Sequence, residues 1–204
     1  MTGGQRVMRM ITDVVVRSPR LWRLTRPVVV RNFDRLAPEW DALRVDEVRL
    51  RPIDAALAAV PGAPSRVLDL GTGTGAVARI AAARWPDAHV TGVDVSPQMI
   101  DEARHRATSE RERYEVADAS ALPFDDEAFD LVALNNMIPF FDELVRVVAR
   151  GGHVAIAYSM GDRTPIYVPL PRVRAELERR GLVVLLEQAT GPGLSLLAER
   201  PKTA

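Results

Sequence analysis

A glycine-rich segment, Asp69-Leu70-Gly71-Thr72-Gly73-Thr74-Gly75-Ala76, follows a short apolar run and can hold a ligand against its backbone. Glycines at alternate positions permit a sharp turn and a close approach of the ligand at the start of the next helix. Gly71, Gly73 and Ala76 also satisfy the spacing of nicotinamide-dinucleotide loops. Asp69 favours another ligand, because a carboxylate attracts an ammonium or sulfonium group and repels a pyrophosphate. A purely structural role for Asp69, in capping the following turn, is the alternative.

Two more carboxylates follow the next apolar runs of the chain. Asp94 ends the run 89–94, roughly 20 positions past the glycine loop, where a carboxylate can accept hydrogen bonds from both hydroxyls of a ribose. Asp118 follows the run 114–117 and could accept a hydrogen bond from an exocyclic adenine amine, although a solvated loop position is the commoner fate of such a residue. The expected neighbours of the adenine ring are Val95, Met99 and Ala119. These residues together indicate an adenosine-containing ligand.

The pattern of apolar residues predicts the elements that position these side chains. Strands are expected over 66–70, 89–94, 114–117, 129–134 and 153–158, with helices over 76–85, 97–108, 141–149 and 171–180. The runs 182–187 and 194–199, joined by a Gly-Pro-Gly turn, predict a hairpin. Repeated strand–helix units predict an α/β fold with a doubly wound, mostly parallel seven-stranded sheet and an antiparallel C-terminal hairpin strand. The ligand residues then meet at the carboxyl ends of the strands.

The first 46 residues follow a different pattern and predict an N-terminal helical cap on the substrate side of an α/β domain over 47–204. We expect helical pieces broken at Pro19, Pro27 and Pro38, and a later helix that begins at Asp46. Residues 1–35 carry eight arginines against two aspartates. This arginine-rich face could lie on an anionic membrane, which would suit an apolar substrate. A solvated helix face is the interpretation that we favour.

The composition excludes several classes of protein. The 204 residues contain no cysteine, so disulfide scaffolds, thiolate metal sites and cysteine nucleophiles are ruled out. The formal net charge is zero, which gives no reason to expect a nucleic-acid partner. No apolar run approaches the roughly 18 residues of a membrane span. We therefore expect a cytoplasmic protein, without a transmembrane segment, whose partner is a small molecule.

Taken in order, these segments resemble the class I S-adenosylmethionine-dependent methyltransferases. Residues 67–75 are similar to the first motif of that family and residues 94–100 to its second-strand motif. Residues 118–124 and 129–132 resemble the corresponding motifs of the methyltransferase type 11 branch, which includes the ubiquinone and menaquinone methyltransferases. The matches run from about residue 33 to residue 160 in the order and spacing of the family. The resemblance implies a Rossmann-like methyltransferase fold.

The resemblance also implies a cofactor, a reaction and a set of site residues. The cofactor is S-adenosylmethionine, and the reaction is an SN2 methyl transfer to a small acceptor, which we expect to be apolar. Positioning can supply up to ~7–11 kcal/mol of the barrier, and exclusion of water adds to it. By resemblance, Asp69, Gly71, Thr72, Gly73 and Gly75 hold the methionine end, Asp94 holds the ribose, Asp118, Val95, Met99 and Ala119 surround the adenine, and Asn135 lies beside the transferred methyl group.

No residue stands out as a general base or as a metal ligand. The histidines, His89, His105 and His153, are expected at strand starts or on a solvated helix face, and no ligand-spaced cluster indicates a metal. Tyr158, Asp162 and Tyr167 are the candidates for a base. Trp22, Phe33 and Trp40 could wall an apolar pocket, although core packing is more usual. A nicotinamide-dependent oxidoreductase and a catalytically silent, methyltransferase-like binding protein are the alternatives.

Overall fold

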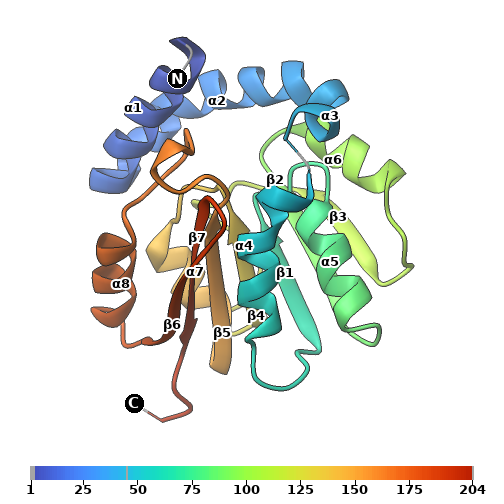
Figure 1. Cartoon of the computed structure of the whole chain (residues 1–204), viewed down its shortest axis with the longest axis vertical. Helices are drawn as coiled ribbons and strands as arrows, with labels where there is room; N and C mark the ends of the chain where they lie inside the picture. The colour runs from blue at the N-terminus through green and yellow to red at the C-terminus, as the bar shows by residue number, and fades with distance from the viewer. Residues whose placement is uncertain (1–2, 45, 204) are drawn as a thin grey trace.

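The computed structural model describes residues 3–44 and 46–203 and shows one twisted sheet between two layers of helices (Figure 1). In this part of the chain the sheet has seven strands in the order β3-β2-β1-β4-β5-β7-β6. Only β7 runs antiparallel to its neighbours, so the predicted doubly wound sheet with an antiparallel hairpin strand is confirmed. The strands are β1 (Arg66–Leu70), β2 (His89–Asp94), β3 (Glu112–Val116), β4 (Phe129–Asn135), β5 (Val148–Tyr158), β6 (Val183–Thr190) and β7 (Gly193–Glu199).

Helices cover both faces of the sheet because the central strands are apolar on both sides. Along β1, Val67 packs in one cluster while Leu68 and Leu70 pack in the other. The first cluster includes side chains of α4 (Glu47–Ala58), α5 (Ala76–Arg84) and α6 (Pro97–His105). The second includes side chains of α7 (Phe141–Val147) and α8 (Leu170–Glu178). The glycine loop between β1 and α5 therefore begins at the end of a central strand of the sheet and leads to the helix layer on one face.

The predicted helix starts are confirmed at two positions. The Asp46 carboxylate accepts a 2.8 Å hydrogen bond from the Arg49 amide at the start of α4. The Ser96 hydroxyl accepts a 3.2 Å hydrogen bond from the Met99 amide at the start of α6. Each bond satisfies an N–H group that has no partner within the helix. The second cap fixes the point at which the chain leaves β2, directly after Asp94.

Several predicted boundaries differ from the structure: α6 ends at His105 rather than at 108, β3 covers Glu112–Val116 rather than 114–117, and two further differences have a clear cause. Pro27 does not break the chain but lies inside α2 (Trp22–Leu36). Its missing N–H affects the carbonyl of Arg23, and both residues are on the exposed side of the helix, where water can replace the bond. Helix α7 also ends at Val147, before the predicted position, because Gly151 and Gly152 belong to the first half of β5.

The N-terminal helices lie across one end of the sheet as a cap (Figure 1). The cap consists of α1 (Gly3–Arg17), η1 (Pro19–Leu21), α2, η2 (Ala37–Glu39) and α3 (Trp40–Arg44). Arg9 Nε donates to the carbonyl of Pro165 at 3.2 Å, and Arg172 donates to the carbonyl of Val16 at 3.0 Å. The division into a cap over 1–46 and a domain over 47–204 stays a prediction, and residues 1, 2, 45 and 204 lie outside the described residues. Among the helices that the structure describes, none has the length and hydropathy needed to cross a bilayer.

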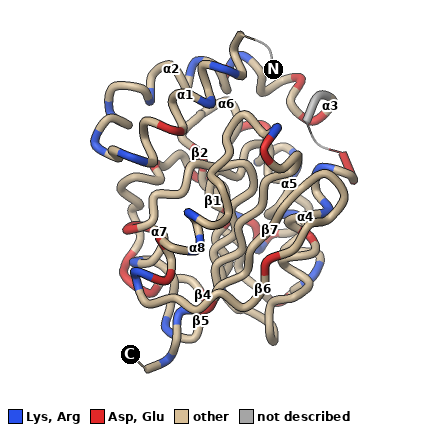
Figure 2. Tube along the Cα trace, turned by 60° about the vertical axis from the view of Figure 1, so that its left-hand side comes forward, with Lys and Arg blue, Asp and Glu red and all other residues tan. Residues whose placement is uncertain are grey.

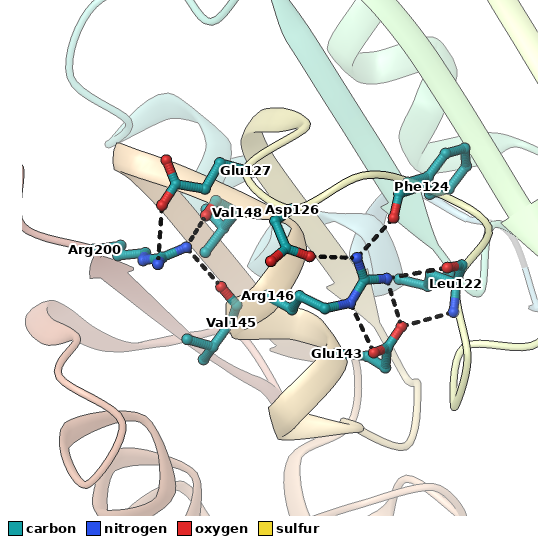
Figure 3. A network of polar contacts seen from close by, with 9 residues as sticks. All are labelled: Leu122, Phe124, Asp126, Glu127, Glu143, Val145, Arg146, Val148 and Arg200. Atoms are coloured by element: carbon teal, nitrogen blue, oxygen red, sulfur yellow. Dashed lines mark hydrogen bonds and ion pairs between the residues drawn. The ribbon is translucent and has the colours of Figure 1, made fainter.

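A network of polar contacts holds the long connection between β3 and β4 against α7 (Figure 3). The Arg146 guanidinium donates to the carbonyls of Leu122 and Phe124, at 3.0 and 2.7 Å. It also pairs with Glu143, whose carboxylate accepts a 2.7 Å hydrogen bond from the Leu122 amide. Because these bonds fix the backbone of 122–124, they anchor the connection that begins with Asp118 and Ala119.

Candidate functional site

A cavity of about 420 Å³ lies between the carboxyl ends of the strands and the cap. This volume is within the range of small-molecule sites, roughly 300–1,000 Å³. The sheet side of the cavity is formed by the glycine loop, the ends of β2 and β4, and the segments that follow β3 and β5. The cap side is formed by α1, α2 and α3. The cavity therefore occupies the position at which open α/β sheets bind their ligands.

The glycine loop turns sharply at the end of β1. The amides of Gly71 and Thr72 both donate to the carbonyl of Val93, at 2.9 Å, which ties the loop to the end of β2. Gly71 has a φ of +75°, and a Cβ at this position would lie 2.7 Å from Met137 Sδ. A larger residue is therefore excluded by both conformation and space. Of the predicted loop residues, Gly71, Thr72 and Gly73 line the cavity.

Gly75 serves the loop in another way. It is the N-cap residue of α5, with a φ of +83°, and a Cβ there would lie 2.8 Å from the hydroxyl of Tyr114. It does not belong to the cavity lining. Its role is to let the helix begin close to β3, rather than to contact a ligand.

Asp94 lies at the cavity, as predicted, at the end of β2. One carboxylate oxygen accepts a 3.0 Å hydrogen bond from the Gly73 amide, and the other accepts a 2.9 Å hydrogen bond from the Ser96 amide. Burial raises the pKa of Asp94, against the lowering effect of these two amides. Each oxygen keeps a free lone pair, so the carboxylate can still accept hydrogen bonds from a ligand.

Asp69 does not face the cavity. Its side chain is buried, and Oδ2 accepts hydrogen bonds from the Thr72 hydroxyl at 2.5 Å and the Ala78 amide at 2.9 Å. Burial raises the pKa of Asp69 to about 7, although both hydrogen bonds oppose the shift. The structure thus shows the capping role that was the alternative for this residue. In this geometry the Asp69 side chain does not contact the position expected for the methionine end of S-adenosylmethionine.

Asp118 is also turned away from the cavity lining. Its Oδ1 accepts hydrogen bonds from Trp22 Nε1 at 2.8 Å and from the Ser120 amide and hydroxyl, at 2.9 and 2.7 Å. Its Oδ2 pairs with Arg26 at 2.8 Å. Burial acts to raise the pKa of Asp118, but the hydrogen bonds from Ser120, Arg26 and Trp22 together lower it. The carboxylate predicted for the adenine amine therefore holds the cap helix α2 in this structure.

The remaining predicted ligand residues do meet at the cavity. Val95, Met99 and Ala119 line it on the side of β2 and β3, and Met99 and Ala119 are almost fully buried. Asn135 lines it at the end of β4. The structure thus brings together most of the predicted cofactor residues, at one apolar slot beside Asp94.

None of the candidate bases lies at the cavity. Tyr158 is fully buried, its ring 5.1 Å from that of Tyr167, and burial raises its pKa. Tyr167 lies under the guanidinium of Arg9, and the backbone carbonyl of Asp162 accepts a hydrogen bond from the same arginine. Burial also raises the pKa of Tyr167. Tyr167 and the backbone of Asp162 thus help to anchor α1, and Tyr158 packs against Tyr167 in the core.

The histidines stay away from the site, as predicted. His89, His105 and His153 are absent from the cavity lining, and burial lowers the pKa of His153. Within the described residues, no group of three or more histidine, cysteine or acidic side chains could hold a metal ion.

Several other residues line the cavity although sequence patterns gave little reason to predict them as site residues. Trp22, Phe33 and Trp40 all line the cavity, and Trp22 and Phe33 also pack in the hydrophobic core, so both expected roles are observed. Asn136 has a φ of +56°, and its side chain accepts a hydrogen bond from the Ser159 amide at 2.8 Å and donates one to the Ser159 hydroxyl at 2.7 Å. An Asn-Asn pair at a strand end was a signal for such a turn, because asparagine tolerates positive φ.

Comparisons with known proteins show similarity to methyltransferases. Residues 67–152 match a family model described as a methyltransferase domain. A demethylmenaquinone methyltransferase of Thermus thermophilus is 39% identical over 140 residues, which are 61% of this chain and 62% of that protein. A malonyl-[acyl-carrier protein] O-methyltransferase of Halorhodospira halophila is 38% identical over 144 residues, 66% of this chain and 48% of that protein. The chain thus spans about half to three fifths of the length of these relatives.

A solved structure shares the fold. A SAM-dependent methyltransferase from Aquifex aeolicus superposes with a TM-score of 0.67 at 20% identity, over 79% of this chain and 97% of that one. Residues 67–152 are thus similar to a methyltransferase domain, and the chain is similar to relatives named as demethylmenaquinone and ubiquinone/menaquinone methyltransferases.

Proposed function

We propose that this protein transfers a methyl group from S-adenosylmethionine to a small, largely apolar acceptor. One observation carries the proposal. A single cavity joins a polar half, formed by the glycine loop and Asp94, to an apolar half beneath the cap. The first half suits an adenosine-containing cofactor and the second suits an acceptor with little charge.

The residues of the polar half fit the cofactor of this family. Gly71 and Gly73 line the cavity with backbone alone, so a ligand can approach the main chain closely there. The Asp94 carboxylate is placed to accept hydrogen bonds from the ribose hydroxyls. Val95, Met99 and Ala119 form an apolar slot for the adenine ring. When bound, S-adenosylmethionine supplies an electrophilic methyl group.

The cap half of the cavity supports an apolar acceptor. Most of its wall consists of aliphatic, sulfur-containing and aromatic side chains, which gain by contact with a ligand of low polarity, although Gln5, Asn32, Arg35 and Arg49 also line the cavity. A relative named as a demethylmenaquinone methyltransferase is consistent with such an acceptor. The wall residues are Met8, Trp22, Val29, Phe33, Leu36, Trp40, Leu50, Met137, Ile138, Met160 and Ile166.

The residues of the cavity act mainly by binding, orientation and exclusion of water. Among the described lining residues, Asp94 is the single carboxylate, and there is no histidine, tyrosine, lysine or cysteine. The amide and hydroxyl groups of Asn135, Asn136 and Ser159 belong to residues that also line the cavity and can orient a polar atom of the acceptor. The acceptor then reacts in a form that needs no proton removed by a side chain, for example as an anion that ionises in water. Positioning in a dry site supplies the remaining acceleration.

Calorimetry with S-adenosylhomocysteine tests the proposal. We expect the wild-type chain to bind it in a one-to-one complex and Asp94→Ala to weaken binding by about 10- to 100-fold, since one or two charge-assisted hydrogen bonds are lost. Asp87→Ala is the matched control, because Asp87 is exposed and outside the cavity.

Two outcomes would count against the proposal. Binding of a reduced nicotinamide dinucleotide, with no binding of S-adenosylhomocysteine, would indicate an oxidoreductase. Tight S-adenosylhomocysteine binding without methyl transfer to any of a broad panel of quinones, phenols and carboxylic acids would indicate a silent binding protein. Methyl transfer to an apolar member of the panel, lost in Asp94→Ala, would support it.

A further inference from the structure

The outer surface of the cap is unusually apolar for an exposed helix pair. Six of the ten exposed large hydrophobic side chains among the described residues lie on α1, η1 and α2. The most exposed are Leu24, at 75%, Met10, at 60%, and Val28, at 53%. The other three are Val7, Val14 and Leu21. An apolar surface concentrated on one end of a molecule marks an interaction site more often than scattered residues do.

The same surface carries positive charge. Six exposed arginines of the cap take part in none of the ion pairs of the described residues, whereas Arg26, on another side of α2, is bonded to Asp118. Figure 2 shows the basic residues of α1 and α2 spread along the cap with few carboxylates between them. Asp13 is the exposed carboxylate within α1, and Asp34 of α2 is half-buried against the Ser96 hydroxyl. The six arginines are Arg6, Arg17, Arg20, Arg23, Arg31 and Arg35.

Helix α2 has two different sides. Leu24, Val28 and Arg31 are spaced by four and three residues, so they share the exposed side. Trp22, Val29 and Phe33 are spaced by seven and four residues, so they share the opposite side of α2, and they line the cavity. One helix therefore separates the cavity from the surface that carries the exposed alkyl groups and arginines.

We propose that this outer cap face, defined by Met10, Leu24, Val28 and the arginines named above other than Arg35, which lines the cavity, docks on the surface of an anionic lipid bilayer. Alkyl side chains can enter the interface while arginines reach the lipid phosphates around them. A protein partner is a poorer match, because charged residues are depleted at the centre of protein interfaces, whereas here arginines alternate with alkyl groups along α2.

Docking would place the cavity close to the bilayer. The width of one helix, about 10 Å, separates the outer cap face from the residues of α2 that line the cavity. An acceptor dissolved in the bilayer could then reach the site without crossing much water. This last step rests on the proposed function, but docking itself does not.

Sedimentation with lipid vesicles tests the docking. We expect the protein to bind vesicles that contain roughly one third phosphatidylserine, to bind phosphatidylcholine vesicles far less, and to be released as the salt concentration rises from about 0.1 M to about 1 M. The double variant Arg23→Gln with Arg31→Gln should bind anionic vesicles roughly 25-fold less, at about fivefold for each arginine. Leu24→Gln should also reduce binding.

Matched variants on other surfaces control for net charge and exposed hydrophobicity. Arg111→Gln with Arg113→Gln removes the same charge beside β3, and Leu185→Gln removes an exposed leucine from β6. These variants should bind vesicles as the wild type does. All variants should keep the wild-type affinity for S-adenosylhomocysteine, since none of these residues lines the cavity.

Three results would overturn the docking. They are equal binding to neutral and anionic vesicles, equal losses in the control variants, and a dimer in light scattering that Leu24→Gln converts to monomer. The last would make the face an interface between two copies. Loss of S-adenosylhomocysteine binding by wild-type protein that still binds vesicles would instead contradict the proposed function alone.

Discussion

Trp22 Nε1 donates a 2.8 Å hydrogen bond to Asp118 Oδ1 and so connects the cap to the loop that follows β3. The Trp22 ring also packs edge-on against Phe140, 5.5 Å away, and lines the cavity. Asp118, the carboxylate that the resemblance assigns to the adenine, therefore holds the cap to the loop beside the cavity. Opening of the cap would release that carboxylate, so we expect cap motion and cofactor exchange to be coupled.

Trp22→Phe tests this coupling. The variant removes the hydrogen bond but keeps an aromatic ring, and we expect the free energy of unfolding to fall by about 1–3 kcal/mol. S-adenosylhomocysteine should dissociate several-fold faster in stopped-flow experiments, because the cap opens more easily. Trp85→Phe is the control, since Trp85 is similarly buried but lies at the end of α5, away from the cavity. Equal dissociation rates in the two variants would refute the coupling.

Asp69 should give the protein a measurable dependence of stability on pH. Burial raises the pKa of Asp69 to about 7 in the folded state, from 3.8. The folded protein then binds more protons than the unfolded chain between these values, so this residue makes the free energy of unfolding decrease as the pH rises from about 4 to about 7. The decrease cannot exceed about 4 kcal/mol.

Asp69→Asn isolates this contribution, because asparagine cannot ionise and can still accept a hydrogen bond from the Ala78 amide. Urea denaturation of both proteins across this range of pH should show the wild type losing stability relative to the variant as the pH rises. A stability difference that stays constant with pH would contradict the raised pKa of Asp69.

Gly71→Ala should be more damaging than the same change at another glycine of similar conformation. Gly62 has a φ of +74°, and a methyl group there would have no neighbour within 4 Å, whereas at Gly71 the methyl group would meet Met137 Sδ. Gly62→Ala should cost about 1–2 kcal/mol of stability from its conformation alone. Gly71→Ala should cost about 1–3 kcal/mol more and weaken S-adenosylhomocysteine binding.

The clash at Gly71 can be tested further with a second substitution. Met137→Ala combined with Gly71→Ala should recover part of the lost stability, measured by urea denaturation, because it removes the side chain that the new methyl group meets. If the double variant were no more stable than Gly71→Ala, the contact with Met137 would not be the cause.

The absence of a base among the described cavity residues predicts how the rate depends on pH. With a panel of related acceptors, kcat should rise with pH around the pKa of each acceptor, rather than around one value set by the protein. Asp162→Asn and Tyr167→Phe should change kcat by less than about twofold, since neither lines the cavity. A pH profile that stays the same for acceptors of different pKa would show that a protein side chain takes the proton.

Local patterns in the sequence were enough to predict the sheet and much of the site. The strand 66–70, the strand 89–94 and the caps at Asp46 and Ser96 are found where they were predicted, because each depends on neighbouring residues. The glycine loop and Asp94 meet at the cavity because the carboxyl ends of parallel strands share one edge of the sheet. The resemblance to S-adenosylmethionine-dependent methyltransferases followed from the order of these motifs.

Only the tertiary structure decided which way the other side chains turn and what they contact. Asp69 shares a face of β1 with Val67, so it points toward α5, where the Ala78 amide is its partner. Asp118 is held by Trp22 and Arg26, which lie more than 90 positions earlier in the chain. The exposure of Leu24 likewise depends on how the cap packs. Sequence periodicity fixes local geometry, whereas contacts between distant segments arise only when the folded chain brings them together.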